Sequence, residues 1–281
     1  MPIVLENVSH VYMPNSAMSQ TALNNVSFRV EEGEFFCIIG HTGSGKTTLL
    51  QHMNGLVQPS GGRVLVDGLD LSVKKQRVEA RSRVGLVFQY PEYQLFEETV
   101  FSDIAFGPKN LHVPEAEIRE RVEEAMLLVG LAPDLFAEKS PFDLSGGEKR
   151  RAALAGILAM RPRYLLLDEP MAGLDPKGRQ SVIDLLQALR EKTGCAIVMV
   201  SHSMDDVARN AEKIAVLNHG ALVMLDTPKN VFAEPEKLID LGLDIPQAAQ
   251  LALKLRERGV QAPAGAYREE ELYAFLLEAL K

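Results

Sequence analysis

The chain has 281 residues, 46% of them hydrophobic and 24% charged, which is the composition of a globular protein with a sizeable buried core. Its formal net charge of −8 argues against a broad electrostatic surface for nucleic acid. Its longest apolar runs, such as FFCIIG and ALAGILAM, fall well short of the roughly twenty residues that a membrane-spanning helix needs.

The first ninety residues read mostly as β-strands separated by Gly, Asn and Asp turns. The chain opens directly on the alternating strand pattern IVLENVSHVY, with no secretory leader, and we therefore expect a cytoplasmic protein. Strands are predicted at residues 3–12, 22–30, 34–39, 63–67 and 84–88, and one helix at 46–54 interrupts them. Cys37 and Cys195 stand alone in apolar, strand-like runs, which favours reduced core thiols over a disulfide or a metal site.

The pattern changes to helical between about residues 98 and 160. Thr99 can cap a short helix that ends at Phe106, where Gly107 and Pro108 stop it. Strands then return in alternation with helices, at residues 164–167, 196–200, 213–217 and 221–225. This order predicts a largely parallel sheet with crossover helices and a helical insertion. Beyond residue 226 the chain is expected to be helical, with amphipathic stretches at 245–258 and 268–281.

The segment GHTGSGKT lies between an apolar strand and a helix, and it matches the pattern of a phosphate-binding loop. Glycines let such a loop curl so that backbone N–H groups and a helix N-terminus converge on phosphate oxygens. Lys46 would bind the β- and γ-phosphates and Thr47 would ligate Mg²⁺. A chance match in a chain of this length is expected about once in a hundred. The candidate ATP-binding residues are Gly40, His41, Thr42, Gly43, Ser44, Gly45, Lys46, Thr47 and Thr48.

The segment YLLLDEP is an apolar strand that ends in two acids. Such a strand belongs in a sheet covered on both faces, and it delivers Asp168 to the carboxyl edge, where open α/β sheets bind ligands. Asp168 can hold Mg²⁺ there, and Glu169 is placed to orient or deprotonate a water that attacks the γ-phosphate. Alone this signal is weak, because any strand can end in acids; beside the phosphate loop it is strong.

The segment LSGGEKRR opens a long helix with Ser145, Gly146 and Gly147. A helix N-terminus with bare glycines can bind an anion, yet one triphosphate does not need two such sites in one chain. This suggests that the second site serves the nucleotide of another subunit. The alternative is an ordinary Ser N-cap followed by two glycines.

Together, GHTGSGKT, LSGGE, LLLDEP, AGLDP and the isolated SH at Ser201 and His202 resemble the ATPase domain of ABC proteins, in this order and spacing. The resemblance extends to about residue 226. It implies that ATP and Mg²⁺ are bound and that two ATPase domains close head to tail. It further implies that Tyr12 stacks on adenine, that Gln89 contacts Mg²⁺ and the attacking water, and that His202 contacts the γ-phosphate. The alternatives are a packed strand aromatic for Tyr12 and a capping histidine for His202.

In the same resemblance, the ATP of the opposite protomer is contacted by Ser145, Gly146, Gly147, Glu148 and Asp175. Glu148 stands where the family more often has glutamine. A carboxylate in the first turn of a helix suits the helix dipole, and Lys149, Arg150 and Arg151 follow it. We interpret this basic cluster as helix-surface charge near a nucleotide rather than as a nucleic-acid site.

The stretch FQYPEYQLFEETVFSDIAFGP is rich in aromatic residues and carboxylates and contains no Lys or Arg. It follows Gln89, the expected last residue of a strand, so one of its ends is expected to lie next to the nucleotide. Aromatic walls and carboxylates suit the docking of an amphipathic helix that carries Arg, and the segment resembles the site where coupling helices of a membrane subunit dock. Packing of the aromatic residues within the protein is the alternative. The candidate docking residues are Tyr90, Glu92, Tyr93, Phe96, Glu97, Glu98 and Asp103.

This stretch and the tail TPKNVFAEPEKLIDLGLDIPQAAQLALKL are similar to the ATPase component of energy-coupling factor transporters, which import vitamins and transition-metal ions in prokaryotes. The long first loop, HVYMPNSAMSQTALNNVSF, resembles the second of the two ATPase types that pair in them. The resemblance implies an α/β fold: a P-loop NTPase (RecA-like) core, an N-terminal antiparallel β-subdomain, an inserted α-helical subdomain and a small helical C-terminal extension. Residues 1–226 would form the ATPase domain, with the insertion at about 89–160, and residues 227–281 the extension, which can serve dimerisation.

The implied partners are a second ATPase, either a paralogue or an identical copy, an integral membrane scaffold (T) subunit and exchangeable substrate-binding (S) subunits. The protein would be peripheral on the cytoplasmic face of the membrane, without a nucleic-acid partner. Alternatives are the ATPase of a conventional ABC importer or of a cobalt or nickel transporter. The single cassette and the acidic charge argue against a soluble ABC ATPase that acts on nucleic acid or ribosomes. The presence of Glu169 and His202 argues against a nucleotide-binding regulator that does not hydrolyse ATP.

Overall fold

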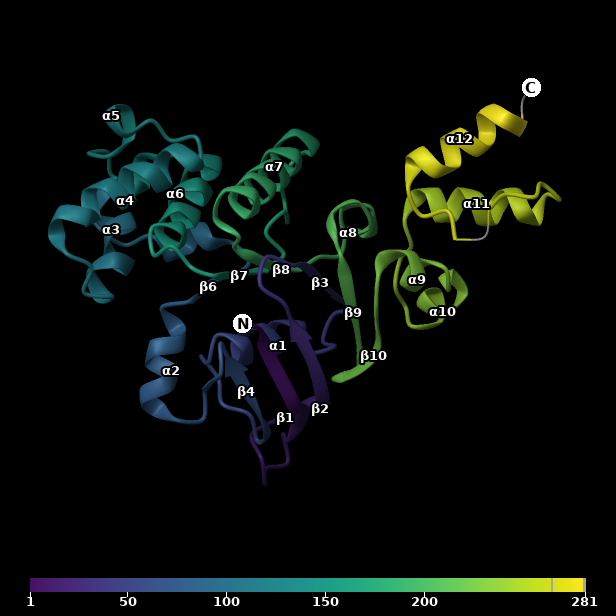
Figure 1. The fold of residues 1–281 in the computed structure, drawn as a ribbon, viewed down its shortest axis with the longest axis horizontal. Helices are drawn as coiled ribbons and strands as arrows, with labels where there is room; N and C mark the ends of the chain where they lie inside the picture. Colours follow the sequence, from purple (N-terminus) through teal and green to yellow (C-terminus); the bar gives the residue numbers. More distant parts are fainter. Residues whose placement is uncertain (264, 280–281) are drawn as a thin grey trace.

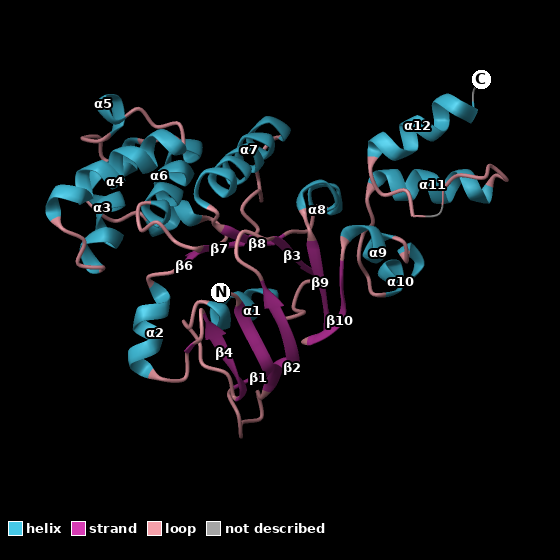
Figure 2. Cartoon of the chain, in the orientation of Figure 1, coloured by secondary structure: helices cyan, strands magenta, loops and turns pink. Residues whose placement is uncertain are grey.

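Two β-sheets form the centre of the computed structural model, which describes residues 1–263 and 265–279. Figure 2 shows these strands in magenta with helices around them. The larger sheet has the strand order β10-β9-β3-β8-β7-β6 and is parallel except for β10, which confirms the predicted sheet. Its strands are β3 (Phe35–Gly40), β6 (Val84–Val87), β7 (Tyr164–Asp168), β8 (Ala196–Val200), β9 (Lys213–Asn218) and β10 (Ala221–Asp226).

The smaller sheet is antiparallel, with the order β2-β1-β4-β5, and it is the N-terminal β-subdomain that the resemblance implied. Ile3 and Leu5 of the first strand are buried, as the alternation of its sequence predicted, and a register shift after Leu5 turns Val8 to the buried side. The strands are β1 (Ile3–Tyr12), β2 (Gln20–Val30), β4 (Gly61–Val66) and the short β5 (Leu69–Asp70).

Each strand of the larger sheet contributes to two hydrophobic cores, because successive side chains point to opposite faces. Phe36 and Ile38 pack in the core shared with the smaller sheet and with α1 (Lys46–Met53), whereas Cys37 and Ile39 pack in the core beneath the other helices. Both cysteines of the chain are buried free thiols, in agreement with the prediction, and burial raises the pKa of each.

Helices gather at the two ends of the molecule's long axis (Figure 1). The inserted helices α3 to α6 lie at one end, α7 lies beside them, and α11 and α12 lie at the opposite end with the C-terminus. The bounds are η1 (Pro91–Gln94), α3 (Val100–Asn110), α4 (Glu115–Leu128), α5 (Pro133–Phe136), η2 (Pro141–Asp143), α6 (Gly146–Leu158), α7 (Pro176–Thr193), α8 (Met204–Asn210), α9 (Pro228–Phe232), α10 (Pro235–Asp240), α11 (Gln247–Glu257) and α12 (Glu269–Ala279).

Three local predictions were wrong. A second helix, α2 (Lys74–Arg81), interrupts the early strands; it buries only Ala80 and therefore shows no apolar periodicity. The helix that begins after Thr99 continues through Gly107 and Pro108 and ends at Asn110, so Pro108 lies in its last turn. Gly107 packs closely on Met160, where an added Cβ would lie 2.8 Å from Cγ. Finally, β6 ends two residues before Gln89.

The C-terminal helices bury part of their apolar face on each other. Ala248 and Ala252 of α11 pack with Leu272 of α12, while Tyr273 and Leu277 remain exposed. The apolar face predicted for residues 268–281 is thus only partly covered, and its member Leu280 lies, with Lys281, outside the described residues. No helix in the described part of the chain combines the length and the hydropathy that a bilayer span requires.

Candidate functional site

The predicted phosphate loop joins β3 to α1 at the carboxyl edge of the larger sheet. Gly43 and Gly45 have φ angles of 81° and 101°, and a Cβ added to Gly45 would lie 2.4 Å from the carbonyl oxygen of Ala22. Position 45 therefore requires glycine. At the start of the loop, a Cβ on Gly40 would lie 2.4 Å from Ser44 Oγ. The loop has the tight curl that directs backbone N–H groups and a helix N-terminus at an anion.

Lys46 is held inside this loop. Its Nζ donates hydrogen bonds to the carbonyl oxygens of Gly40 at 2.7 Å and His41 at 2.9 Å, and the residue is only 6% exposed. Burial lowers the pKa of Lys46, opposed by the negative charges of Glu169 and Asp168. A buried ammonium group bound to neutral carbonyls is available for exchange onto a stronger, anionic acceptor.

Thr47 and Asp168 meet beside the lysine. The Thr47 hydroxyl donates to Asp168 Oδ2 at 2.6 Å, which joins the first helix to the end of β7. Burial raises the pKa of Asp168, and the hydrogen bond from Thr47 opposes this. Within the described residues, no group of three or more His, Cys, Asp or Glu side chains could hold a metal ion.

Glu169, His202 and Gln89 come together from the segments that follow three neighbouring strands, β7, β8 and β6. His202 Nε2 lies 2.8 Å from Glu169 Oε1, and Gln89 Nε2 donates to Glu169 Oε2 at 3.5 Å. Glu169 has a φ of 50°, and its N–H donates to the carbonyl of Val200 at 3.1 Å. An unusual backbone conformation held in place by the sheet is typical of functional positions. The Glu169 side chain is 24% exposed and can contact water.

Tyr12 lies at the end of β1, beside the first helix. Its hydroxyl is 3.1 Å from Thr48 Oγ1, and the residue is 39% exposed. The structure therefore does not bury Tyr12 as an ordinary strand aromatic, and part of its ring remains available to a base.

Ser145 caps α6 through a capping box with Glu148. The Ser145 hydroxyl donates to Glu148 Oε2 at 2.6 Å, and the Ser145 N–H donates to the same oxygen at 2.8 Å. These hydrogen bonds lower the pKa of Glu148. Asp175 caps α7 and accepts a hydrogen bond from the Gly178 N–H at 2.7 Å. Both motifs thus lie at helix N-termini, as the sequence predicted for Ser145.

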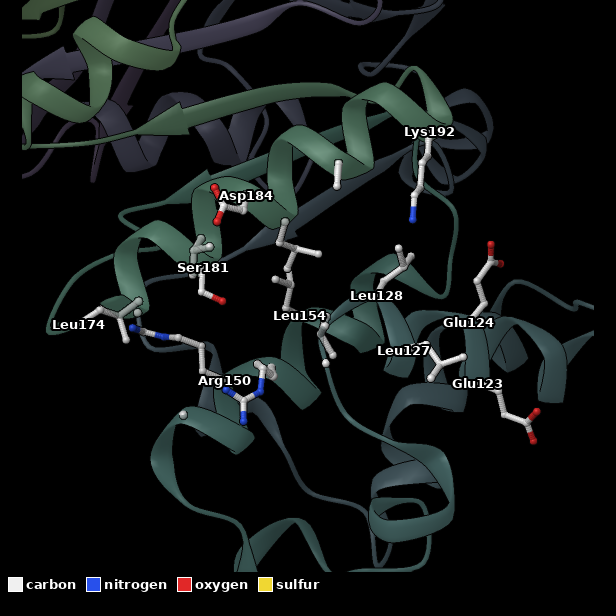
Figure 3. A pocket seen from close by; sticks show the side chains of 18 of the residues that line it. Glu123, Glu124, Leu127, Leu128, Arg150, Leu154, Leu174, Ser181, Asp184 and Lys192 are labelled. Atoms are coloured by element: carbon white, nitrogen blue, oxygen red, sulfur yellow. The ribbon is translucent and has the colours of Figure 1, made fainter. Parts of the chain in front are cut away.

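A cavity of about 1010 Å³ separates α7 from α4 and α6, and Gly147 and Asp175 line it together. In Figure 3, Arg150 and Ser181 lie toward one end of this cavity, and Lys192 and Glu124 toward the other. Among the described residues, none of positions 40–48 lines it. Gly147 of the LSGGE segment therefore lines, with Asp175, a cavity that the phosphate loop of the same chain does not line.

The basic cluster after Glu148 is partly engaged within the chain. Arg150 donates to the carbonyl of Ala172 at 3.0 Å, and its Nε lies 3.5 Å from Glu92 Oε2. Its side chain is only 12% exposed. Arg150 therefore links α6 to η1 rather than forming an open basic surface.

The aromatic and acidic stretch after Gln89 divides into internal and exposed groups. Asp103 Oδ2 accepts hydrogen bonds from the N–H groups of Phe96 and Glu97, both at 2.9 Å, and Glu92 pairs with Arg150. These two predicted docking carboxylates thus have partners inside the chain. Glu97 and Glu98 have no side-chain partner among the described residues.

The exposed aromatic side chains form a patch next to these acids. Tyr93 is 85% exposed, Phe96 57% and Phe106 43%, and the rings of Phe96 and Phe106 lie 4.9 Å apart and perpendicular. Tyr90 is also exposed, with its ring 6.2 Å from that of Tyr93. Phe101, in contrast, packs against the core.

One support of the phosphate loop was missed in the sequence. The turn between β9 and β10 contacts the loop, because the Gly220 N–H donates to the Ser44 carbonyl at 3.0 Å and the rings of His219 and His41 lie 4.6 Å apart. The available signal was the short Asn-His-Gly turn between two apolar runs.

Comparisons with known proteins show which family this chain resembles. Residues 23–172 match the family model described as ABC transporter. A protein of Caldanaerobacter subterraneus subsp. tengcongensis, named energy-coupling factor transporter ATP-binding protein EcfA2, is 51% identical over 100% of this chain and 98% of its own length. A protein of the same name from Symbiobacterium thermophilum is 54% identical over 98% of this chain and 95% of its own.

Two solved structures are also similar. One is cbiO1 from Clostridium perfringens, described as part of the ABC transporter complex cbiONQ. It aligns with a TM-score of 0.73 and 35% sequence identity, over 89% of this chain and 97% of that one. The other is a dimeric ATP-binding cassette in a post-hydrolysis state bound to ADP and Pi, with a TM-score of 0.72, 31% identity, and coverage of 80% and 98%.

Proposed function

This chain belongs to the ABC transporter family, and we propose that it closes on ATP against a second, related ATPase. It is the ATP-hydrolysing subunit of an energy-coupling factor transporter, of the second ATPase type. In this proposal, the closure powers the import of vitamins or other micronutrients. The observation that carries this proposal is the separation, within one chain, of the phosphate loop from the LSGGE segment. Each is half of a nucleotide site, and a second ATPase domain supplies the other half.

The phosphate loop holds the triphosphate in this proposal. Residues 40–48 surround the phosphates, and Lys46 exchanges its two carbonyl acceptors for β- and γ-phosphate oxygens. Tyr12 stacks on the adenine. Ser145, Gly146, Gly147, Glu148 and Asp175 of this chain contact the γ-phosphate side of the nucleotide that the second ATPase holds.

Thr47 and Asp168 fit Mg²⁺. They place a hydroxyl and a carboxylate oxygen 2.6 Å apart, and Mg²⁺ prefers oxygen ligands and is usually held by one or two protein groups together with substrate phosphates. When bound, it neutralises charge on the β- and γ-phosphates. Gln89 is assigned to the same region because of its contact with Glu169.

Glu169 orients the attacking water. Its carboxylate accepts a hydrogen bond from the water, whose oxygen forms the new bond to the γ-phosphorus as the bond to the leaving ADP oxygen breaks. His202, 2.8 Å from this carboxylate, moves from Glu169 to the γ-phosphate when ATP is present. The two side chains thus act as a pair.

The exposed aromatic patch and Glu97 and Glu98 receive coupling helices of a membrane scaffold subunit. Aromatic rings with adjacent unpaired carboxylates suit an amphipathic helix that carries Arg. This assignment makes the chain peripheral on the cytoplasmic face of the membrane. Residues 1–226 act as the ATPase domain, and the extension at 227–281, with Tyr273 and Leu277 exposed, contributes to pairing of the ATPases.

Glu148→Gln is expected to lower the ATP concentration for half-maximal dimer formation by about three- to tenfold. The Ser145 hydroxyl can donate one hydrogen bond, which the Glu148 carboxylate now accepts, and a hydrogen bond to a charged acceptor is roughly twice as strong as one to an amide. The opposite γ-phosphate therefore competes for this hydrogen bond more easily against Gln. Light scattering measures this ATP concentration for Glu148→Gln in a protein that also carries Glu169→Gln. Glu115→Gln, on α4, is the control in the same protein. An unchanged ATP concentration for half-maximal dimer formation would contradict this prediction.

Purification of the tagged protein from mild-detergent membranes tests the proposed function. We expect a second ATPase, one integral scaffold protein and several different small hydrophobic proteins by mass spectrometry. A pair of permeases instead would indicate a conventional importer. Recovery with ribosomes or DNA in the soluble fraction would refute the transport role.

A further inference from the structure

Tyr12 belongs to a closed set of four side chains that joins the N-terminal sheet to the phosphate-loop helix. The His10 ring lies 4.5 Å from the Tyr12 ring and nearly perpendicular to it, at 79°, and the His52 ring lies 4.8 Å from His10. His52 Nδ1 is 2.6 Å from the Thr48 carbonyl oxygen, and Thr48 Oγ1 is 3.1 Å from the Tyr12 hydroxyl. The contacts therefore return to Tyr12.

The two histidines of this set are buried, His10 to 8% exposure and His52 to 1%. Nδ1 of His52 carries the proton, because its partner is a carbonyl oxygen that can only accept. Burial lowers the pKa of His52, and the hydrogen bond to the Thr48 carbonyl opposes this. His10 Nδ1 is buried without a hydrogen-bond partner. Polar rings with incomplete hydrogen bonding are not the side chains that best stabilise a core.

We infer that His10 and His52 are positioning residues that fix the Tyr12 ring for nucleotide binding. This inference rests on the proposed stacking of adenine on Tyr12. The His10 ring packs against the Tyr12 ring, and the His52 ring, on α1, packs against His10. The Thr48 hydroxyl forms a hydrogen bond with the Tyr12 hydroxyl. A ring that is already ordered does not lose conformational freedom when the base binds.

The same set links the base to the phosphates. Tyr12 stands on β1, whereas Thr48 and His52 stand on α1, the helix whose N-terminus forms the phosphate loop. The distance between the adenine platform and the loop is therefore set by side-chain contacts rather than by the long connection through β2. This arrangement favours a ligand that has both an aromatic base and a polyphosphate.

The test compares ATP with inorganic tripolyphosphate, which has no base. His10→Ala should raise the Kd of the full-length protein for ATP about three- to tenfold, since ordering one side chain on binding has about this effect. The Kd for tripolyphosphate should stay within twofold of wild type. The KM for ATP should rise with its Kd, and His10→Phe, which keeps a ring beside Tyr12, should recover most of the affinity.

A double-mutant cycle with Tyr12→Ala separates positioning from packing. Positioning predicts that His10→Ala adds little to Tyr12→Ala, because the ring that it orders is gone. His52→Ala should behave as His10→Ala does, and His112→Asn, an exposed histidine after α3, serves as the control.

The outcomes distinguish the inference from its premise. If Tyr12→Ala leaves ATP affinity unchanged, stacking on Tyr12 is refuted. If Tyr12→Ala weakens ATP binding and His10→Ala does not, or if the two effects add fully, the positioning role is refuted. An equal loss of ATP and tripolyphosphate binding would also refute it, because His10 would then act on the phosphate loop.

Discussion

Glu169→Gln will lower the rate of ATP hydrolysis by about 100-fold or more and leave ATP binding intact. Gln has nearly the same size and can keep a hydrogen bond to a water molecule, but it cannot accept the proton that the water loses, and a general base contributes about 10²- to 10⁴-fold. Lys46, Thr47 and Asp168, which hold the phosphates and Mg²⁺ in our proposal, are unchanged in this variant.

The measurement is single-turnover hydrolysis by the purified transporter together with ATP affinity by filter binding. We expect slow turnover and a stable ATP-bound dimer. Glu191→Gln, on the exposed side of α7, removes one carboxylate far from the site and should behave as wild type. Undiminished hydrolysis in Glu169→Gln would refute the role of Glu169, whereas lost ATP binding would show that the carboxylate organises the phosphate loop.

The nucleotide motifs could be predicted because their signals are local. A phosphate loop needs glycines at fixed positions, and the backbone at Gly43 and Gly45 has the positive φ angles that explain them. Likewise, the run of buried leucines before Asp168 is read directly as a strand covered on both faces. The largely parallel character of the larger sheet and the position of Glu169 at its edge follow from these patterns.

The contacts between distant segments could not be predicted. Nothing in the sequence pairs Glu92 with Arg150, and this pairing removes one predicted docking carboxylate from the surface. The helix α2 has almost no buried side chain, so its sequence carries no periodicity to detect. The His10 and His52 contact likewise depends on how β1 packs against α1, which only the folded chain establishes.

Lys46→Met will weaken ATP binding by about 100-fold or more. A hydrogen bond to a charged group contributes about 1.5–3 kcal/mol, and Lys46 is expected to make such bonds to two phosphates. Together they contribute at least about 3 kcal/mol, which is more than 100-fold in affinity. Methionine keeps most of the aliphatic stem, which fills the space next to Gly40, and the fold should remain.

Titration with a fluorescent ATP analogue measures this loss, with Lys75→Met on the exposed side of α2 as the control. Lys46→Arg should also bind poorly, because a planar guanidinium group does not fit a site in which the residue is 6% exposed and bonded to two carbonyls. A Kd within threefold of wild type in both variants would refute the phosphate role of Lys46. The membrane partners should still copurify with both variants, because the exposed aromatic patch lies on α3 and η1 rather than on the phosphate loop. Loss of nucleotide binding with retained assembly would therefore separate the two surfaces that the proposed transporter subunit needs.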